Sequence, residues 1–447
     1  MADIRDYLEW RGDLDFAASP MNEVDLAIIS ALVYLPFENI ASHNLTGLTI
    51  AELDARFNAD LKLVEVLDMQ RSLNGFLAPL AATRRFGNGR LHRFSSITED
   101  NEVDEKDEQF CAATFSFPAG DEEIVVVVAF RGTDSTMVGW RENFTMGYAD
   151  TVPAQHDALD YLADALETFP RVYVCGHSKG GNLAMWSAAK VAPEAQERII
   201  SVLNFDGPGL NDVMLATPGW EAIRPRVRSL VPESSVIGML LGTGEPREVV
   251  AAEGASFAQH DLFMWHVRRT AFERADSMTA SSAIVDRGID EYMASTTDEQ
   301  RRDFVYGLFK LVNPGNAATT DELLPSLMKN LPARLRASAR GKDEEGFTDG
   351  ERAALKEFMG CLRRAGAAEL GESLAEFAEE KISAQFGRGD GDKDAKDAKD
   401  AKDAALETAE AEAGAEAGAE AEAATPDARV DVTGAAAAEE PETTHES

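Results

Sequence analysis

Residues 171–186 have the sequence Arg-Val-Tyr-Val-Cys-Gly-His-Ser-Lys-Gly-Gly-Asn-Leu-Ala-Met-Trp. The apolar, β-branched run Val172–Cys175 predicts a short strand, and the alanine-rich residues after the glycines predict a helix. Between the two the chain must turn sharply, with Ser178 at the apex. Gly176 and Gly180 would let the strand and the helix pass close to one another, because neither residue carries a Cβ atom.

A serine at the apex of a strand–turn–helix unit is typical of the nucleophile elbow of α/β-hydrolases, where the turn exposes the hydroxyl to a carbonyl substrate. The backbone N–H of Lys179 would then face the oxyanion formed by the attack, at the positive end of the following helix. The alternative is a glycine-rich turn that merely contains a serine. The predicted strand and helix on either side favour the elbow.

The histidine that could activate this serine is sought further along the chain, because the triad of α/β-hydrolases runs in the order serine, acid, histidine. Three histidines follow: His260, His266 and His445. His445 lies in a low-complexity segment, and His266 lies in the apolar stretch 262–267, which favours a packed core residue. His260 comes from a more polar stretch and is our candidate base; the alternative is a surface histidine in a loop.

Two carboxylates are candidates for the acid that orients the histidine. Asp206 follows the predicted strand Ile199–Phe205, and catalytic groups gather at the carboxyl ends of strands in open α/β sheets. Glu233 follows the next predicted strand and ranks second. Asp261 is adjacent to His260 in the chain, and sequence neighbours rarely have the reach to orient a ring. Each carboxylate could instead cap a turn.

The second oxyanion donor is expected in the loop after an earlier strand. The continuous apolar run Ile124–Phe130 predicts a strand buried on both faces, and it leads into Arg-Gly-Thr with Thr133 as the third residue. Thr133 could offer both its backbone N–H and its hydroxyl. The alternative is a simple turn before a helix.

The overall pattern predicts an α/β fold. Strands are expected at Ile124–Phe130, Val172–Cys175, Ile199–Phe205, Val227–Val231 and Glu248–Ala251. Helical patterns separate them, so residues 111–270 should form a doubly wound, mostly parallel sheet flanked by helices, as in an α/β-hydrolase core.

The segments on either side of this core are expected to be helical. Residues 1–110 should form helices and loops integral to the hydrolase, including a helix that begins at Glu23 after an Asn22 cap. Residues 271–387 have successive helical patterns, such as 298–312 and 350–386. Residues 388–447 contain Lys-Asp-Ala repeats and no aromatic residue, which predicts a disordered acidic tail.

Composition excludes several functions. The net charge is −36; residues 389–447 hold 18 acidic and 5 basic residues, so the body is acidic in its own right. This argues against a nucleic-acid partner or an anionic membrane surface. Three widely spaced cysteines (Cys111, Cys175, Cys361) favour a reducing compartment without a zinc site. No signal peptide or spanning segment is apparent, so we expect a cytoplasmic protein. A triad of serine, histidine and an acid would need no metal or organic cofactor.

Several segments carry a family resemblance. Residues 130–144, together with the elbow, resemble the class 3 lipases, in which the residue after Arg-Gly is the oxyanion Ser or Thr; this resemblance implies that role for Thr133. More closely, the chain is similar to the Mbeg1-like α/β-hydrolases. The matching segments are Asp6–Leu14, Met21–Asp25, Gly176–Ala184, Asn204–Gly209, Val231–Leu240 and Gln259–Asp261. The resemblance implies a serine hydrolase and supplies no established substrate.

One departure affects the choice of acid. Class 3 lipases place it in an Asp-x-Val-Pro context, whereas residues 231–238 offer Glu233, two serines and no aspartate. An aspartate directly after the strand that follows the elbow helix is similar to the pancreatic-lipase arrangement, which favours Asp206. The sequence hypothesis is therefore a serine hydrolase of small-molecule or lipid-like carboxylic esters. The alternative is a catalytically inactive hydrolase fold that serves as a binding or scaffold module, with the acidic tail contacting an unknown partner.

Overall fold

A seven-stranded sheet forms the centre of the computed structural model, which describes residues 1–37, 46–60, 73, 75–99, 107–121, 123–133, 137–241, 246–254, 256–312 and 347–366. The strands are β1 (Arg90–Glu99), β2 (Glu108–Pro118), β3 (Ile124–Phe130), β4 (Val172–His177), β5 (Ile199–Phe205), β6 (Val227–Pro232) and β7 (Arg247–Val250). The pairs β1–β2 and β2–β3 are antiparallel, and each later pair is parallel. The expected mostly parallel sheet is therefore confirmed.

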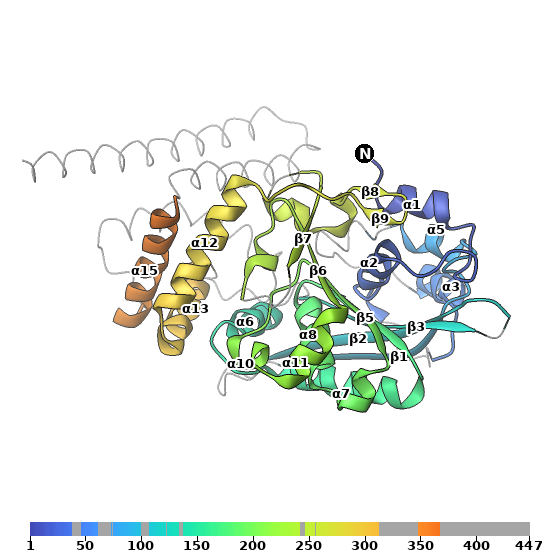
Figure 1. Ribbon diagram of the computed structural model, residues 1–447, viewed down its shortest axis with the longest axis horizontal. Helices are drawn as coiled ribbons and strands as arrows, with labels where there is room; N and C mark the ends of the chain where they lie inside the picture. The colour runs from blue at the N-terminus through green and yellow to red at the C-terminus, as the bar shows by residue number, and fades with distance from the viewer. Residues whose placement is uncertain are drawn as a thin grey trace, which may run out of the picture. The chain divides into compact units, whose positions relative to one another are not determined.

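The strands lie side by side in the order in which they occur in the chain (Figure 1). Right-handed crossovers along such a sheet place the connecting helices on one face. Accordingly, α7 (Pro153–Thr168), α8 (Lys179–Lys190) and α11 (Pro218–Ile223) share one hydrophobic cluster. The prediction of a doubly wound sheet is wrong. A doubly wound sheet has a point where the strand order reverses, whereas the order here follows the sequence throughout.

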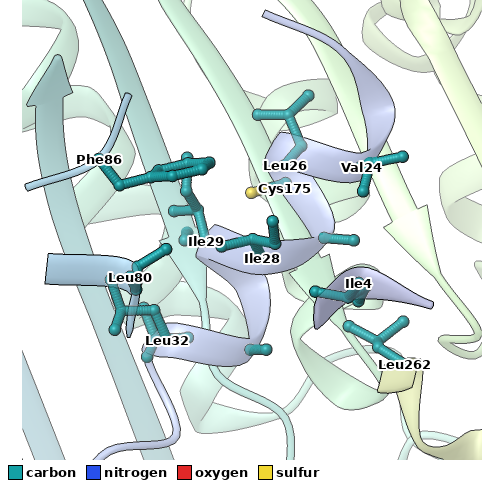
Figure 2. Packing of buried hydrophobic residues seen from close by; sticks show 14 of the residues in the cluster. Ile4, Val24, Leu26, Ile28, Ile29, Leu32, Leu80, Phe86, Cys175 and Leu262 are labelled. Atoms are coloured by element: carbon teal, nitrogen blue, oxygen red, sulfur yellow. The ribbon is translucent and has the colours of Figure 1, made fainter. Parts of the chain in front are cut away.

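The opposite face is covered by helices from the N-terminal region: α1 (Ile4–Arg11), α2 (Glu23–Leu32), α3 (Ile50–Asp60) and α5 (Leu77–Ala81). Side chains of β4 alternate between the faces, so that Val174 joins the cluster of α7 and α8 while Cys175 joins that of α2. Figure 2 shows Ile28 and Ile29 of α2 within this second cluster. The predicted start of α2 is confirmed, with the Asn22 side chain accepting from two backbone N–H groups.

Residues 50–110 differ from the expectation of helices and loops. They contain α3 and α5, but also β1 and the start of β2. β1 is an edge strand that pairs only with β2 in the sheet, and most of its residues are partly or fully exposed. The sequence analysis did not predict β1 because its residues are mostly polar. An edge strand needs no continuous apolar run.

Three helices lie in the residues after 272 that the structure describes. They are α12 (Ala280–Ser295), α13 (Asp298–Val312) and α15 (Asp349–Ala365). The prediction for 298–312 is confirmed, whereas the helix expected over 350–386 ends at Ala365, followed by Gly366 in the left-handed conformation. α13 packs on α6 (Met137–Thr145), where the ring centroids of Phe309 and Phe144 are 5.5 Å apart. Residues 367–386 of the predicted 350–386 helix, the predicted acidic tail and His445 lie outside the described residues.

Among the described residues there are also short elements: α9 (Pro193–Gln196), α10 (Asp212–Leu215), η2 (Arg224–Arg226), η3 (Ile237–Met239), η4 (Ser256–His260), η5 (Leu262–Met264) and the hairpin of β8 (Val267–Arg268) with β9 (Ala271–Phe272). In the part of the chain that the structure describes, no helix has the length and apolar character needed to cross a membrane. The same residues contain no cluster of three or more His, Cys, Asp or Glu side chains arranged to hold a metal ion.

Candidate active site

Ser178 lies in the turn between β4 and α8 with a strained backbone, φ 57° and ψ −135°. Non-glycine residues with positive φ are uncommon and cluster at functional sites. Two hydrogen bonds hold the turn: the N–H of Ser178 donates to the oxygen of Phe205 at 2.9 Å, and the N–H of Gly181 donates to the oxygen of Ser178 at 2.8 Å. The surrounding backbone therefore fixes the serine in this conformation.

The close approach predicted for the two glycines is present. A Cβ atom on Gly176 would lie 2.1 Å from the oxygen of Gly180, and one on Gly180 would lie 2.1 Å from the oxygen of Phe130. Both distances are far shorter than a van der Waals contact, and the atoms that would clash are backbone oxygens, which cannot move aside as a side chain can. The turn can therefore have this shape only with glycine at both positions.

Asp206 and His260 meet beyond the carboxyl ends of the parallel strands. Asp206 directly follows β5, and its side chain is 1% exposed. Its Oδ2 atom lies 2.6 Å from Nδ1 of His260, which is at the end of η4 and has a side chain 24% exposed. Because a carboxylate only accepts, Nδ1 carries the proton, and Nε2 is left free to act as a base.

The second oxygen of Asp206 is also bonded, by a residue that the sequence did not single out. The hydroxyl of Ser235 donates to Oδ1 of Asp206 at 2.5 Å and accepts from the N–H of Gly238 at 3.1 Å. The hydroxyl of Ser282, on α12, donates to the backbone oxygen of Ser235. Both carboxylate oxygens are therefore occupied, which fixes the orientation of Asp206.

The other candidates have different surroundings. In the described structure Asp206, rather than Glu233, bonds to His260; the backbone of Glu233 pairs with Val250 and Thr279. The Asp261 carboxylate accepts from the N–H of Phe263 and caps η5. His266 is half-buried, and its backbone N–H donates to Ala251.

Thr133 lies in the loop that borders Ser178. It is 8% exposed, and its buried hydroxyl oxygen has no hydrogen-bond partner among the described residues. A Cβ atom on the preceding residue, Gly132, would lie 2.8 Å from Cβ of Ser178, so this loop touches the elbow. Lys179 is the first residue of α8, where the backbone N–H has no acceptor within the helix. The two predicted oxyanion donors thus come from neighbouring segments.

The side chain of Lys179 is buried and ion-paired, which the sequence did not indicate. Its Nζ atom lies 2.9 Å from Oε2 of Glu142, on α6, and 2.7 Å from Oε1 of Gln109. Glu142 also accepts from the backbone N–H groups of Gln109 and Ala154, each at 3.0 Å. This buried pair ties α6, which follows the Thr133 loop, to the elbow helix.

We expect Lys179→Met to lower the free energy of unfolding by about 3–5 kcal/mol, because it leaves the buried Glu142 carboxylate without its cationic partner. Urea unfolding at pH 7 measures the loss. The control is Arg224→Met, which breaks the exposed pair with Glu221 and should cost at most about 1 kcal/mol. Equal losses in the two variants would contradict the assigned importance of the buried pair.

A mostly parallel sheet, a strained serine between a strand and a helix, and an Asp–His pair from later loops define an α/β-hydrolase fold. The family model of the Mbeg1-like proteins matches residues 80–310, and the chain belongs to this family. No curated protein matches the chain.

Two solved lipase structures are similar at low identity. One is described as the crystal structure of M37 lipase, with 15% identity over 48% of this chain and 67% of that chain, at a TM-score of 0.28. The other is a fungal lipase–inhibitor complex, with 16% identity over 37% of this chain and 66% of that chain, at a TM-score of 0.26. The match thus spans slightly less than two thirds of the fungal enzyme.

Proposed function

We propose that this protein is a serine hydrolase that cleaves carboxylic esters with Ser178, His260 and Asp206 as its triad. The observation that carries the proposal is the 2.6 Å contact between Nδ1 of His260 and Oδ2 of Asp206. The two residues are 54 positions apart in the sequence. Asp206 directly follows β5, which is the neighbour of β4, the strand that ends just before Ser178. A buried carboxylate that orients a partly exposed imidazole is the arrangement that a serine hydrolase requires.

In the proposed reaction, Oγ of Ser178 attacks the ester carbonyl and its proton passes to Nε2 of His260. Asp206 stabilises the resulting imidazolium. The negative charge moves to the carbonyl oxygen, where Thr133 and the N–H of Lys179 donate to it. Collapse of the tetrahedral intermediate expels the alcohol, which takes the proton from His260. Water then attacks the acyl-enzyme by the same steps and releases the acid. The scheme uses side chains and backbone alone, without a metal or cofactor.

The expected substrate class, small-molecule or lipid-like esters, rests on the resemblance of residues 130–144 to class 3 lipases. The negative net charge of −36 favours neutral over anionic substrates, because it repels anions at long range. A series of p-nitrophenyl esters with acyl chains of increasing length tests this choice.

The most direct test of the proposal is labelling of the purified full chain with a fluorophosphonate, which reacts with activated serines. We expect one labelled residue, Ser178, identified by peptide mass. An unlabelled protein that also fails to hydrolyse p-nitrophenyl esters would contradict the proposal and favour the alternative, a catalytically inactive binding or scaffold module.

We expect Asp206→Asn to lower kcat for p-nitrophenyl esters by about 10³- to 10⁴-fold, because the amide no longer holds the His260 tautomer that accepts the serine proton. Glu233→Gln is the matched control and should keep kcat within about twofold of wild type. Steady-state kinetics on both variants gives the comparison. A larger loss in Glu233→Gln than in Asp206→Asn would exchange the two assignments.

A further inference from the structure

His177, the residue before Ser178, is fully enclosed and uses both of its ring nitrogens. It is 1% exposed; Nδ1 lies 2.9 Å from the hydroxyl of Tyr34, and Nε2 lies 2.8 Å from the backbone oxygen of His260. A carbonyl oxygen only accepts, so Nε2 carries the proton and Nδ1 accepts from Tyr34. The two contacts therefore define one tautomer and a direction for each hydrogen bond.

The Tyr34 hydroxyl extends this chain of hydrogen bonds to the oxyanion loop. It accepts from the backbone N–H of Gly132 at 3.1 Å while it donates to His177. It also lies 3.4 Å from the backbone oxygen of His177. The series runs from Gly132 N–H through Tyr34 and His177 to the oxygen of His260. Each member donates to the next, so the bonds reinforce one another.

The packing allows little freedom at these positions. A Cβ atom on Gly132 would lie 2.1 Å from the Tyr34 hydroxyl oxygen, and the rings of His177 and His260 have centroids 4.4 Å apart. The pKa of His177 lies well below its ordinary value, mainly because the ring is buried and secondarily because His260 is its neighbour. His177 therefore stays neutral and keeps its tautomer while His260 gains and loses a proton.

Three members of the series adjoin or belong to residues of the proposed catalytic centre. Gly132 precedes Thr133, His177 precedes Ser178, and the last acceptor is the backbone of His260. Tyr34 lies just after the end of α2, in the layer of N-terminal helices on the face of the sheet opposite to α8. We propose that Tyr34 and His177 are positioning residues, which together hold the oxyanion loop and the base histidine at fixed places relative to the nucleophile. This inference rests on the proposed esterase function.

The test is Tyr34→Phe, which removes the shared hydroxyl and keeps the ring. We expect kcat for p-nitrophenyl butyrate and the rate of fluorophosphonate labelling to fall together by about 10- to 100-fold, with KM within about twofold of wild type. The reason is that a displacement of catalytic groups by up to about 1 Å weakens their interactions with the transition state more than substrate binding, so kcat falls while KM changes little.

The matched control is Tyr7→Phe, a buried tyrosine of the same layer whose hydroxyl bonds to Asp25 and Asn22, away from Ser178. It should lower thermal stability and leave kcat unchanged. A similar fall of kcat in both variants, or a Tyr34→Phe enzyme with at least half of the wild-type kcat, overturns the positioning role.

A second pair of variants covers the case in which Tyr34→Phe does not fold. His177→Gln can place an amide N–H near the position of Nε2 and should retain at least tenfold more activity than His177→Leu, which has no donor. Equal kcat in the two folded variants overturns the inference. Wild-type protein that is neither labelled nor active overturns the proposed function itself, and the positioning role with it.

Discussion

Replacement of Ser178 by alanine should lower kcat for p-nitrophenyl acetate by roughly 10⁴- to 10⁶-fold, the loss seen when a triad nucleophile is removed. The reason is that no other group at the apex of the elbow can form the acyl-enzyme. Steady-state kinetics on purified protein, with background hydrolysis subtracted, measures the effect. Fluorophosphonate labelling should disappear in parallel.

The fold should survive this change, because the Ser178 side chain makes no capping hydrogen bond to α8 and its backbone bonds to Phe205 and Gly181 remain. The matched control is Ser201→Ala, which removes a serine hydroxyl near the start of β5, away from the carboxyl end of that strand. This hydroxyl donates to the backbone oxygen of Arg226. It should keep wild-type kcat. Activity of Ser178→Ala above a few per cent of wild type, in a preparation free of wild-type enzyme, would contradict the assignment.

The parallel part of the sheet could be predicted because most of the residues of β3, β4, β5 and β6 are buried. β3 and β5 have the expected bounds, while β4, β6 and β7 differ by one or two residues. β3 and β4 each contain a continuous apolar run, at Ile124–Phe130 and Val172–Cys175, whereas β5, β6 and β7 contain shorter apolar stretches beside polar residues. β1 lacks such a run, since it pairs on one side only and exposes polar side chains. Strand order also escaped prediction, because a local pattern does not state which strands become neighbours.

The candidate site follows the same division between local and long-range information. The strain at Ser178 and the close glycines are consequences of one short segment, so the motif contains them. Asp206 and Glu233 both follow predicted strands, and only the three-dimensional arrangement shows which of them meets His260. Ser235 and Tyr34 gave no local signal, because each acts through a partner far away in the chain: Asp206 for Ser235, and His177 with Gly132 for Tyr34.

Replacement of His260 by alanine should be about as damaging as the serine change, roughly 10⁴- to 10⁶-fold in kcat, because the serine proton then has no acceptor. The side chain is 24% exposed, so the space left by the ring is open to solvent. We therefore expect added imidazole to restore part of the activity of His260→Ala, with saturation and with an increase as pH rises through the pKa of free imidazole. Imidazole should have no such effect on Ser178→Ala.

His266→Ala is the control that separates the base from a histidine that serves the fold. His266 pairs through its backbone with Ala251 and Glu273, and its Nδ1 atom is buried without a hydrogen-bond partner among the described residues. Its loss should change the melting temperature and leave kcat of the folded enzyme within a few-fold of wild type. An inactive, folded His266→Ala beside an active His260→Ala would reverse the assignment. Imidazole rescue of the inactive variant would then identify His266 as the base.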